Sequence, residues 1–284
     1  MNSTRANHDP VREWVIKDTN SEISLNTSYP RIIETILISR GIINEEVIEA
    51  FLEPALKSLG DPFALPQMTT AVDRILEAID KKENIVVYGD YDVDGVTSLT
   101  MMKKVLGAYD NVAITFMPHR IDDGYGLSIS ALKHCIDKHR PSLIVAVDCG
   151  TTSIKEIDWL NESGIDSVIL DHHEPLSEGL PKANAVVNPK ISESEFPKNY
   201  QYLCSVGIVF KLAHALLKLR PLAHFDLRDY LDIVALGTVA DLVPLIDENR
   251  ILVKKGLKIM ARTKNTGLAA LTEISNIRPP FSAM

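Results

Sequence analysis

The chain of 284 residues has few cysteines and no long apolar run. Its three cysteines, Cys135, Cys149 and Cys204, form neither a paired disulfide framework nor the spacing of a zinc site, so we interpret them as reduced thiols. No apolar stretch has the length that crosses a bilayer, and the polar start, residues 1–10, lacks the apolar core of a signal peptide. These absences predict a cytoplasmic protein with no membrane association.

An excess of positive charge is absent as well. The formal net charge of −8 argues against a surface that binds nucleic acid over its whole extent, so contact with a phosphate backbone would be confined to a local groove. Hydrophobic residues make up 45% of the sequence, which is enough for one large domain with an N-terminal appendage.

Three short apolar runs each end in acidic or imidazole side chains. They are Ile85–Tyr88 before Asp90, Leu143–Val147 before Asp148, and Ser167–Leu170 before Asp171, His172 and His173. A carboxylate at the end of a strand adds nothing to an apolar core, so folding alone does not explain this repetition. Segments with helical periodicity separate the runs, and this alternation predicts an α/β fold with a parallel sheet flanked by helices.

The polar side chains after these runs are predicted to meet at one edge of the sheet, because parallel strands present their carboxyl ends together. The expected set is Asp92, Asp94, Asp148, Asp171, His172 and His173. Carboxylates with imidazoles suit manganese or magnesium better than a structural zinc. Several acidic ligands also allow two ions about 3.5 to 4 Å apart, an arrangement that activates water and binds a phosphoryl group.

Each of these features has an ordinary structural interpretation when it is taken alone. Asp148 could be a helix cap or turn residue, Asp90–Gly95 could be an acidic turn, and one of two adjacent histidines is often a surface or core residue. Their common position at the ends of strands favours a site.

The remaining pattern predicts a mostly helical N-terminal segment, residues 1–68, and a second domain, residues 69–284. Further helices are expected over Thr70–Asp80, Val96–Leu106, Ser130–His139, Ser153–Ser163, Val206–Leu219, Leu227–Leu236 and Ile251–Met260. Two further strands are expected over Val112–Met117 and Ala185–Val187, the second just before Asn188, and the charged residues 190–199 are expected to form a loop.

Three motifs carry a family resemblance: DYDVDG, VDCGTTS and LDHHEP, in this order. They resemble the successive motifs of the DHH phosphoesterase superfamily, and within it the RecJ single-strand-specific exonucleases. PHRIDDGYGL, from Pro118 to Leu127, and LDIVALGTVADLVPL, from Leu231 to Leu245, resemble further RecJ motifs. The resemblance runs from about Trp14 to about Ile277, and it assigns residues 69–284 to a DHH domain with a helical C-terminal part.

The resemblance implies a division of the metal ligands. Asp92 would bind the first ion and Asp94 the second, with Asp148 bridging both. It also implies that His172 and Asp241 complete the second site. Some relatives have a histidine where this chain has Tyr88, so the first ion would rely on Asp90 or water. Manganese is the preferred ion, with magnesium as the alternative.

His173 is expected to face the scissile phosphate, where an imidazolium stabilises developing negative charge. With Asp92, Asp94 and Asp148 it forms the predicted catalytic set.

Other residues are candidates for binding the substrate. Gly150 and Thr151 open a helix whose free N–H groups favour anions, although they could equally cap that helix. Arg120 can bind a phosphate in a bidentate manner, and Tyr125 could stack on a base or pack in the core.

The resemblance implies a 5′→3′ exonuclease that releases nucleoside 5′-monophosphates from single-stranded DNA in DNA repair and recombination. A helicase or a single-strand-binding protein would be its partner. Two alternatives stay open: a DHH hydrolase of short oligonucleotides, cyclic dinucleotides or pyrophosphate, and a non-catalytic nucleic-acid-binding scaffold. RecJ-like proteins continue beyond the position that corresponds to Met284, so we expect the DHH domain to be truncated at its C-terminal end.

Overall fold

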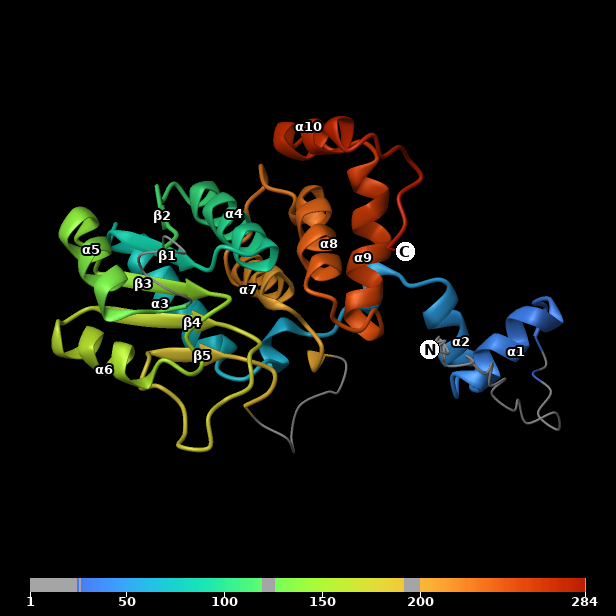
Figure 1. Cartoon of the computed structure of the whole chain (residues 1–284), viewed down its shortest axis with the longest axis horizontal. Helices are drawn as coiled ribbons and strands as arrows, with labels where there is room; N and C mark the ends of the chain where they lie inside the picture. Colours follow the sequence, from blue (N-terminus) through green and yellow to red (C-terminus); the bar gives the residue numbers. More distant parts are fainter. Residues whose placement is uncertain (1–24, 26, 119–125, 192–199, 284) are drawn as a thin grey trace, which may run out of the picture. The chain divides into compact units, whose positions relative to one another are not determined.

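The computed structural model describes residue 25 and residues 27–118, 126–191 and 200–283. The chain divides into two compact units, Met1–Glu53 and Pro54–Met284 (Figure 1). The second unit therefore begins before Met68, the residue at which the sequence pattern placed the end of the first domain.

The first unit contains helices α1 (Arg31–Ser39) and α2 (Glu45–Leu52). Asn44 begins α2, because its side chain accepts hydrogen bonds from two backbone N–H groups of the first turn. Each helix buries one apolar residue, Leu37 and Ile48.

The second unit starts with two 3-10 turns, η1 (Leu56–Ser58) and η2 (Pro62–Ala64), followed by α3 (Met68–Asp80). Leu65 and Met68 are almost completely buried in the core of this unit. Burial of these apolar side chains explains why the segment after Glu53 belongs to the second unit.

Five parallel strands form the sheet of the second unit, in the order β2-β1-β3-β4-β5. They are β1 (Ile85–Gly89), β2 (Ile114–Phe116), β3 (Leu143–Val147), β4 (Asp166–Leu170) and β5 (Ala185–Val187). Helices α4 (Val93–Ala108), α5 (Ile129–His139) and α6 (Ile154–Glu162) lie between them in the chain. The predicted α/β fold with a parallel sheet flanked by helices is confirmed.

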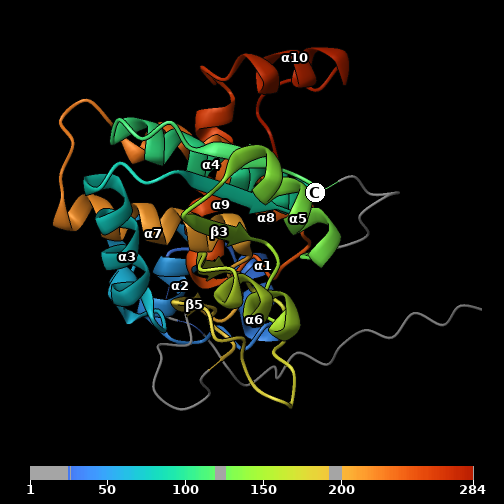
Figure 2. The same cartoon turned by 90° about the vertical axis from the view of Figure 1, so that its left-hand side faces the viewer.

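Both faces of the sheet are covered, and alternate strand residues belong to different apolar clusters. Val87, Val145 and Val147 pack in one cluster with residues of α3 and α4, whereas Tyr88 and Ala146 pack in the other with residues of α5 and α6. Figure 2 shows α5 and α6 on one side of β3, and α3 and α7 on the other. The strands therefore appear in the sequence as continuous apolar runs.

The second unit continues with helices after β5. They are α7 (Ser205–Leu219), η4 (Leu227–Tyr230), α8 (Leu231–Ala240), α9 (Asp247–Met260) and α10 (Thr266–Ile274). The single helix expected over residues 227–236 is a 3-10 turn followed by α8, which extends to Ala240. No helix among the described residues is long and apolar enough to cross a membrane.

A buried ion pair joins α7 to α9. Lys211 Nζ lies 2.9 Å from Glu248 Oε2 and also donates to the carbonyl oxygen of Gly60 at 2.8 Å. Both charged side chains are at most 1% exposed, so each depends on the other for its neutralisation.

Candidate metal centre

Three strands of the sheet end in register, and a buried aspartate follows each of them. Gly89 of β1 is paired with Val147 of β3, which is paired with Leu170 of β4. The next residues are Asp90, Asp148 and Asp171, all at most 1% exposed. Asp148 also adopts a φ of 61°, a conformation that is costly for a residue with a Cβ and that clusters at functional sites.

The start of α4 is built against the end of β1. The side chain of Asp92 accepts a hydrogen bond from the Gly95 N–H at 2.9 Å and so begins the helix. A Cβ at Gly95 would lie 2.4 Å from the carbonyl oxygen of Asp90, so only glycine permits this approach. The first turn of α4 thereby places Asp94 in the buried interior.

Asp94 is held by the N-terminus of α7. The backbone N–H groups of Ser205 and Val206 donate to its two carboxylate oxygens at 2.6 and 2.9 Å. Burial, together with the negative charge of Asp148, nevertheless raises the pKa of Asp94 to about 8. Without a cation, burial beside Asp148 therefore favours the neutral form of this carboxyl group.

His172 lies at the centre of the carboxylates. Its Nε2 is 3.4 Å from Asp148 Oδ1, 3.7 Å from Asp241 Oδ2 and 3.8 Å from Asp94 Oδ2. Among the described residues, two groups offer ligand atoms that all lie within 4.8 Å of one another: Asp148 with His172 and His173, and Asp94 with His172 and Asp241. The four predicted ligands Asp94, Asp148, His172 and Asp241 are thus brought together.

Asp241 reaches this centre because α8 packs closely on α4 and α7. A Cβ at Gly237 would lie 2.3 Å from Thr97 Oγ1 and 2.7 Å from Val206 Cγ1, so glycine is required at this contact. Asp241 follows the last residue of α8, and burial raises the pKa of its carboxyl group.

The donor atoms fit a divalent cation. Both carboxylate oxygens of Asp148 are buried and have no well-oriented hydrogen-bond donor among the residues that the structure describes. Burial raises the pKa of Asp148 to about 8, and the negative charge of Asp92 adds to the effect. Such oxygens are costly to leave without a partner, and a hard cation would satisfy them.

Asp90 and Asp92 belong to neither of the two ligand groups found in the described part of the chain. Asp90 Oδ1 accepts a hydrogen bond from the Tyr91 N–H at 2.7 Å. Tyr88 is fully buried, and its hydroxyl donates to the carbonyl oxygen of Gly126 at 3.0 Å.

His173 is hydrogen-bonded to Asp171. Its Nδ1 lies 2.7 Å from Asp171 Oδ1, and its ring is partly exposed, at 40%. The hydrogen bond to Asp171 raises the pKa of His173 to about 9, although partial burial opposes the shift. Burial would raise the pKa of Asp171, but the hydrogen bonds from His173 and Thr151 hold it well below its ordinary value.

The predicted substrate-binding residues have different positions. Thr151 is fully buried, and its N–H donates to Asp171 Oδ2 at 2.9 Å, so in this structure it holds the aspartate. Gly150 has a φ of 113°, which favours glycine. Arg120 and Tyr125 lie outside the described residues.

Sequence reasoning missed two elements of the site. The N–H groups of Ser205 and Val206 bind Asp94, but backbone donors leave no trace in a sequence pattern. Asn188 follows β5 and lies among the same strand ends, fully buried. Its position after an apolar run is the signal that could have identified it.

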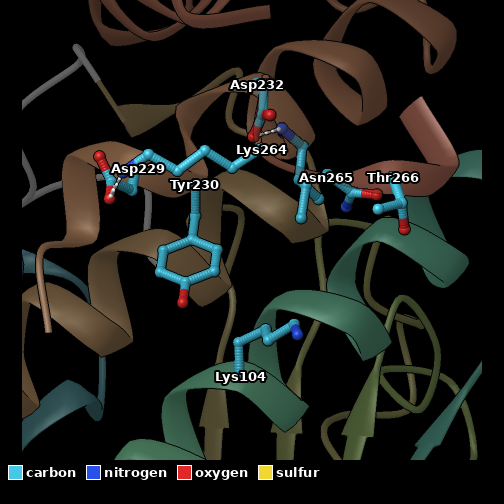
Figure 3. A pocket seen from close by; sticks show the side chains of 8 residues that line it. Lys104, Asp229, Tyr230, Asp232, Lys264, Asn265 and Thr266 are labelled. Atoms are coloured by element: carbon cyan, nitrogen blue, oxygen red, sulfur yellow. Dashed lines mark hydrogen bonds and ion pairs between the residues drawn. The ribbon is translucent and has the colours of Figure 1, made fainter. Parts of the chain in front are cut away.

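A separate pocket of about 260 Å³ lies beside the C-terminal half of α4 and the first turn of α8 (Figure 3). Asp94 and Asp241 are at the opposite ends of these two helices. The pocket is lined by Lys104, Asp229, Tyr230, Asp232, Ile233, Lys264, Asn265 and Thr266. Lys264 Nζ lies 3.0 Å from Asp229 Oδ2, and two lysines are matched by two aspartates, so the lining has no net positive charge to attract a phosphate. None of the candidate metal ligands contributes to it.

Curated proteins similar to this chain include the single-stranded-DNA-specific exonuclease RecJ of Bacillus subtilis, with 39% identity over 86% of this chain and 30% of that protein. The RecJ of Haemophilus influenzae is 36% identical over 92% of this chain and 46% of that protein. The chain thus spans less than half the length of these relatives.

Solved structures similar to this chain also include RecJ exonucleases. A crystal structure of exonuclease RecJ bound to manganese matches with a TM-score of 0.67 and 30% identity, covering 80% of this chain and 54% of that chain. RecJ from Thermus thermophilus in complex with Mn2+ matches with a TM-score of 0.69 and 28% identity, covering 85% of this chain and 33% of that chain. Residues 84–238 match the model of the DHH family, N-terminal domain, and the chain belongs to this family.

Proposed function

We propose that this chain carries the catalytic centre of a metal-dependent 5′→3′ exonuclease that releases nucleoside 5′-monophosphates from single-stranded DNA. The observation that carries the proposal is the convergence of Asp94, Asp148 and Asp241 within 3.4 to 3.8 Å of His172 Nε2. The similarity to RecJ exonucleases, whose names specify single-stranded DNA, supports the substrate.

The proposed cofactor is a pair of divalent ions, with manganese preferred over magnesium. Asp94, His172 and Asp241 would hold one ion, Asp90 and Asp92 would hold the other, and Asp148 would lie between them. When bound, such ions activate water and neutralise the charge that develops on a phosphoryl group. Oxygen donors with one imidazole suit these metals.

His173 would act on the substrate as a cation. Its raised pKa keeps the imidazole protonated at neutral pH, whereas a metal ligand must be neutral. Because Nδ1 is bonded to Asp171, Nε2 is the nitrogen that would donate a hydrogen bond to a phosphate oxygen. This donor would stabilise the transition state of phosphodiester cleavage.

The cellular context is proposed from the same similarity. Such an enzyme would act in the cytoplasm in DNA repair and recombination, with a helicase or a single-strand-binding protein as its partner. Arg120, Tyr125 and Gly150 remain the proposed contacts of the substrate, whereas Thr151 is fully buried and would act only through Asp171.

The deciding experiment compares manganese-dependent digestion of 5′-labelled single-stranded DNA, duplex DNA and dinucleotides. We expect release of labelled mononucleotides from the single strand and little from the duplex. Preferred cleavage of dinucleotides would instead favour a hydrolase of short oligonucleotides. Binding without hydrolysis under all metal conditions would favour a non-catalytic scaffold.

A further inference from the structure

The side chain of Asn188 connects three strand ends of the sheet. It follows β5 directly and is fully buried. Its Nδ2 donates to Thr151 Oγ1 at 2.9 Å and to the carbonyl oxygen of His173 at 2.8 Å, while its Oδ1 accepts from the Lys190 N–H at 2.9 Å. These contacts reach the loops after β3 and β4 and the turn after β5.

The hydrogen bonds form a closed ring of four residues. Asn188 donates to Thr151, and the Thr151 N–H donates to Asp171 Oδ2. Asp171 Oδ1 in turn lies 2.7 Å from His173 Nδ1, and the carbonyl oxygen of His173 accepts from Asn188. The ring holds both the main chain and the imidazole of His173, so this residue is fixed at its backbone and at its side chain.

Only asparagine satisfies all these contacts. A backbone carbonyl accepts and never donates, so the group that faces His173 must be the amide NH2, and the group that faces the Lys190 N–H must be the amide oxygen. Aspartate has the same shape but would place an acceptor against the carbonyl oxygen of His173. Alanine would leave the buried partners without their hydrogen bonds.

We infer that Asn188 is a positioning residue for catalysis, which orients the His173 imidazole through the ring that contains Thr151 and Asp171. This inference rests on the proposed function, since it assigns His173 a task on the scissile phosphate. Partners in the second layer around a site typically contribute about 10- to 100-fold to activity or metal affinity. Because Asn188 contacts none of the candidate ligands Asp94, Asp148 and Asp241 in the bonds described, we expect its effect to fall on turnover.

The test uses the whole chain with the substitution Asn188→Asp, and Asn184→Asp as the matched control. Asn184 precedes the same strand at its opposite end, and its Oδ1 accepts from the Ser167 N–H at 2.8 Å, a contact that aspartate retains. With single-stranded DNA and saturating manganese, kcat of Asn188→Asp should fall about 10- to 100-fold while KM changes little. The control should keep both constants.

A spectroscopic readout is independent of hydrolysis. In the wild type, the Hδ1 proton of His173 should give a slowly exchanging, downfield NMR signal because it lies in the hydrogen bond to Asp171, and His173→Gln identifies this signal. The signal should be lost or broadened in Asn188→Asp and retained in Asn184→Asp. Manganese affinity, measured by isothermal titration, should remain in both variants.

Thr151→Val removes the hydroxyl that accepts from Asn188 and so breaks the ring at a second position. This variant replaces Asn188→Asp in the test if that variant folds poorly. It should reproduce the loss of kcat, and the two substitutions together should cost less than the sum of their separate effects, because each opens the same ring. An unchanged Hδ1 signal or an unchanged kcat in folded Asn188→Asp would overturn the inference. Absence of hydrolysis by the wild type would refute the proposed function, and the NMR comparison would then decide alone whether Asn188 orients His173.

Discussion

Individual residues of the candidate metal centre have opposite protonation preferences. Asp94 and Asp148 hold their protons to a pKa of about 8, whereas Asp171 is ionised through its bonds to His173 and Thr151. A divalent cation would therefore replace the protons of Asp94 and Asp148. Asp171 needs no cation, because its hydrogen bonds already stabilise its negative charge.

Asp148→Asn should abolish hydrolysis, with a loss of about 10³-fold or more, because it removes a charged ligand worth several kcal/mol in the transition state. The same substitution should raise the melting temperature of the metal-free protein at pH 9, because it removes the buried negative charge that a carboxyl group with a pKa of about 8 acquires there. Initial rates with manganese and thermal unfolding in EDTA measure the two effects. Near-normal activity of this variant would contradict a metal centre built on Asp148.

His173→Ala and His172→Ala should separate turnover from metal binding. His172→Ala should weaken manganese binding, because Nε2 lies within 3.8 Å of three carboxylates. His173→Ala should keep most of the affinity and lose about 10²- to 10⁴-fold in kcat. Isothermal titration with manganese decides the matter, and an equal loss of affinity in both variants would show that the roles are wrongly assigned.

At the scale of helices, close packing of α8 on α4 and α7 brings Asp241 to the strand ends. The contact depends on Gly237, where a side chain would meet Thr97 and Val206. Sequence periodicity predicted most helices, but it placed the starts of α4 and α9 too late, at Val96 and Ile251 in place of Val93 and Asp247. The first turns of α4 and α9 contain the buried polar residues Asp94 and Glu248, which interrupt the apolar pattern.

Gly237→Ala should displace α8 and thereby weaken metal binding. The added methyl group overpacks the contact, at a cost of about 1 to 3 kcal/mol in the free energy of unfolding. Gly107→Ala in α4 is the matched control, because a Cβ there has no atom within 4 Å. It should leave manganese affinity unchanged and stabilise the chain by about 0.5 to 1 kcal/mol. Denaturant unfolding and manganese titration of both variants measure these effects, and equal metal affinity would argue against the role of the α8 contact.

For the whole molecule, stability should depend on pH and metal together. The folded state raises the pKa of Asp94 and Asp148 to about 8 from an ordinary value near 4, so the metal-free protein should lose stability as pH rises between these values. The pKa of His173 is raised to about 9, so this residue adds a further loss of folding stability between about pH 6.5 and 9.

Manganese should reverse this trend, because it binds the deprotonated carboxylates. The stabilisation should reach about 2.7 kcal/mol at 100 times the Kd, and it should be larger at pH 8 than at pH 6. Thermal unfolding at both pH values, with manganese and with EDTA, measures it, and Asp94→Asn/Asp148→Asn is the control that should show a weaker response. A larger manganese effect at pH 6 than at pH 8 would contradict the assignment of these two carboxyl groups.

The local sequence pattern alone was sufficient to predict the parallel sheet and the acidic residues that follow its strands. A fully buried parallel strand requires a continuous apolar run, and the carboxyl ends of such strands meet at one edge, so the neighbourhood of Asp90, Asp148 and Asp171 followed from the sequence. The motif resemblance added Asp241 to this set and assigned His172 to the second ion.

Contacts between distant segments were decided by packing in three dimensions. The α7 amides reach Asp94 across 111 and 112 positions of the chain, and Asn188 joins Thr151 across 37. Such hydrogen bonds depend on how helices and loops pack over the sheet, which periodicity within one element does not encode. The strand ends bring the ligands near one another, but the close approach at Gly237 and the ring through Asn188 give the centre its geometry.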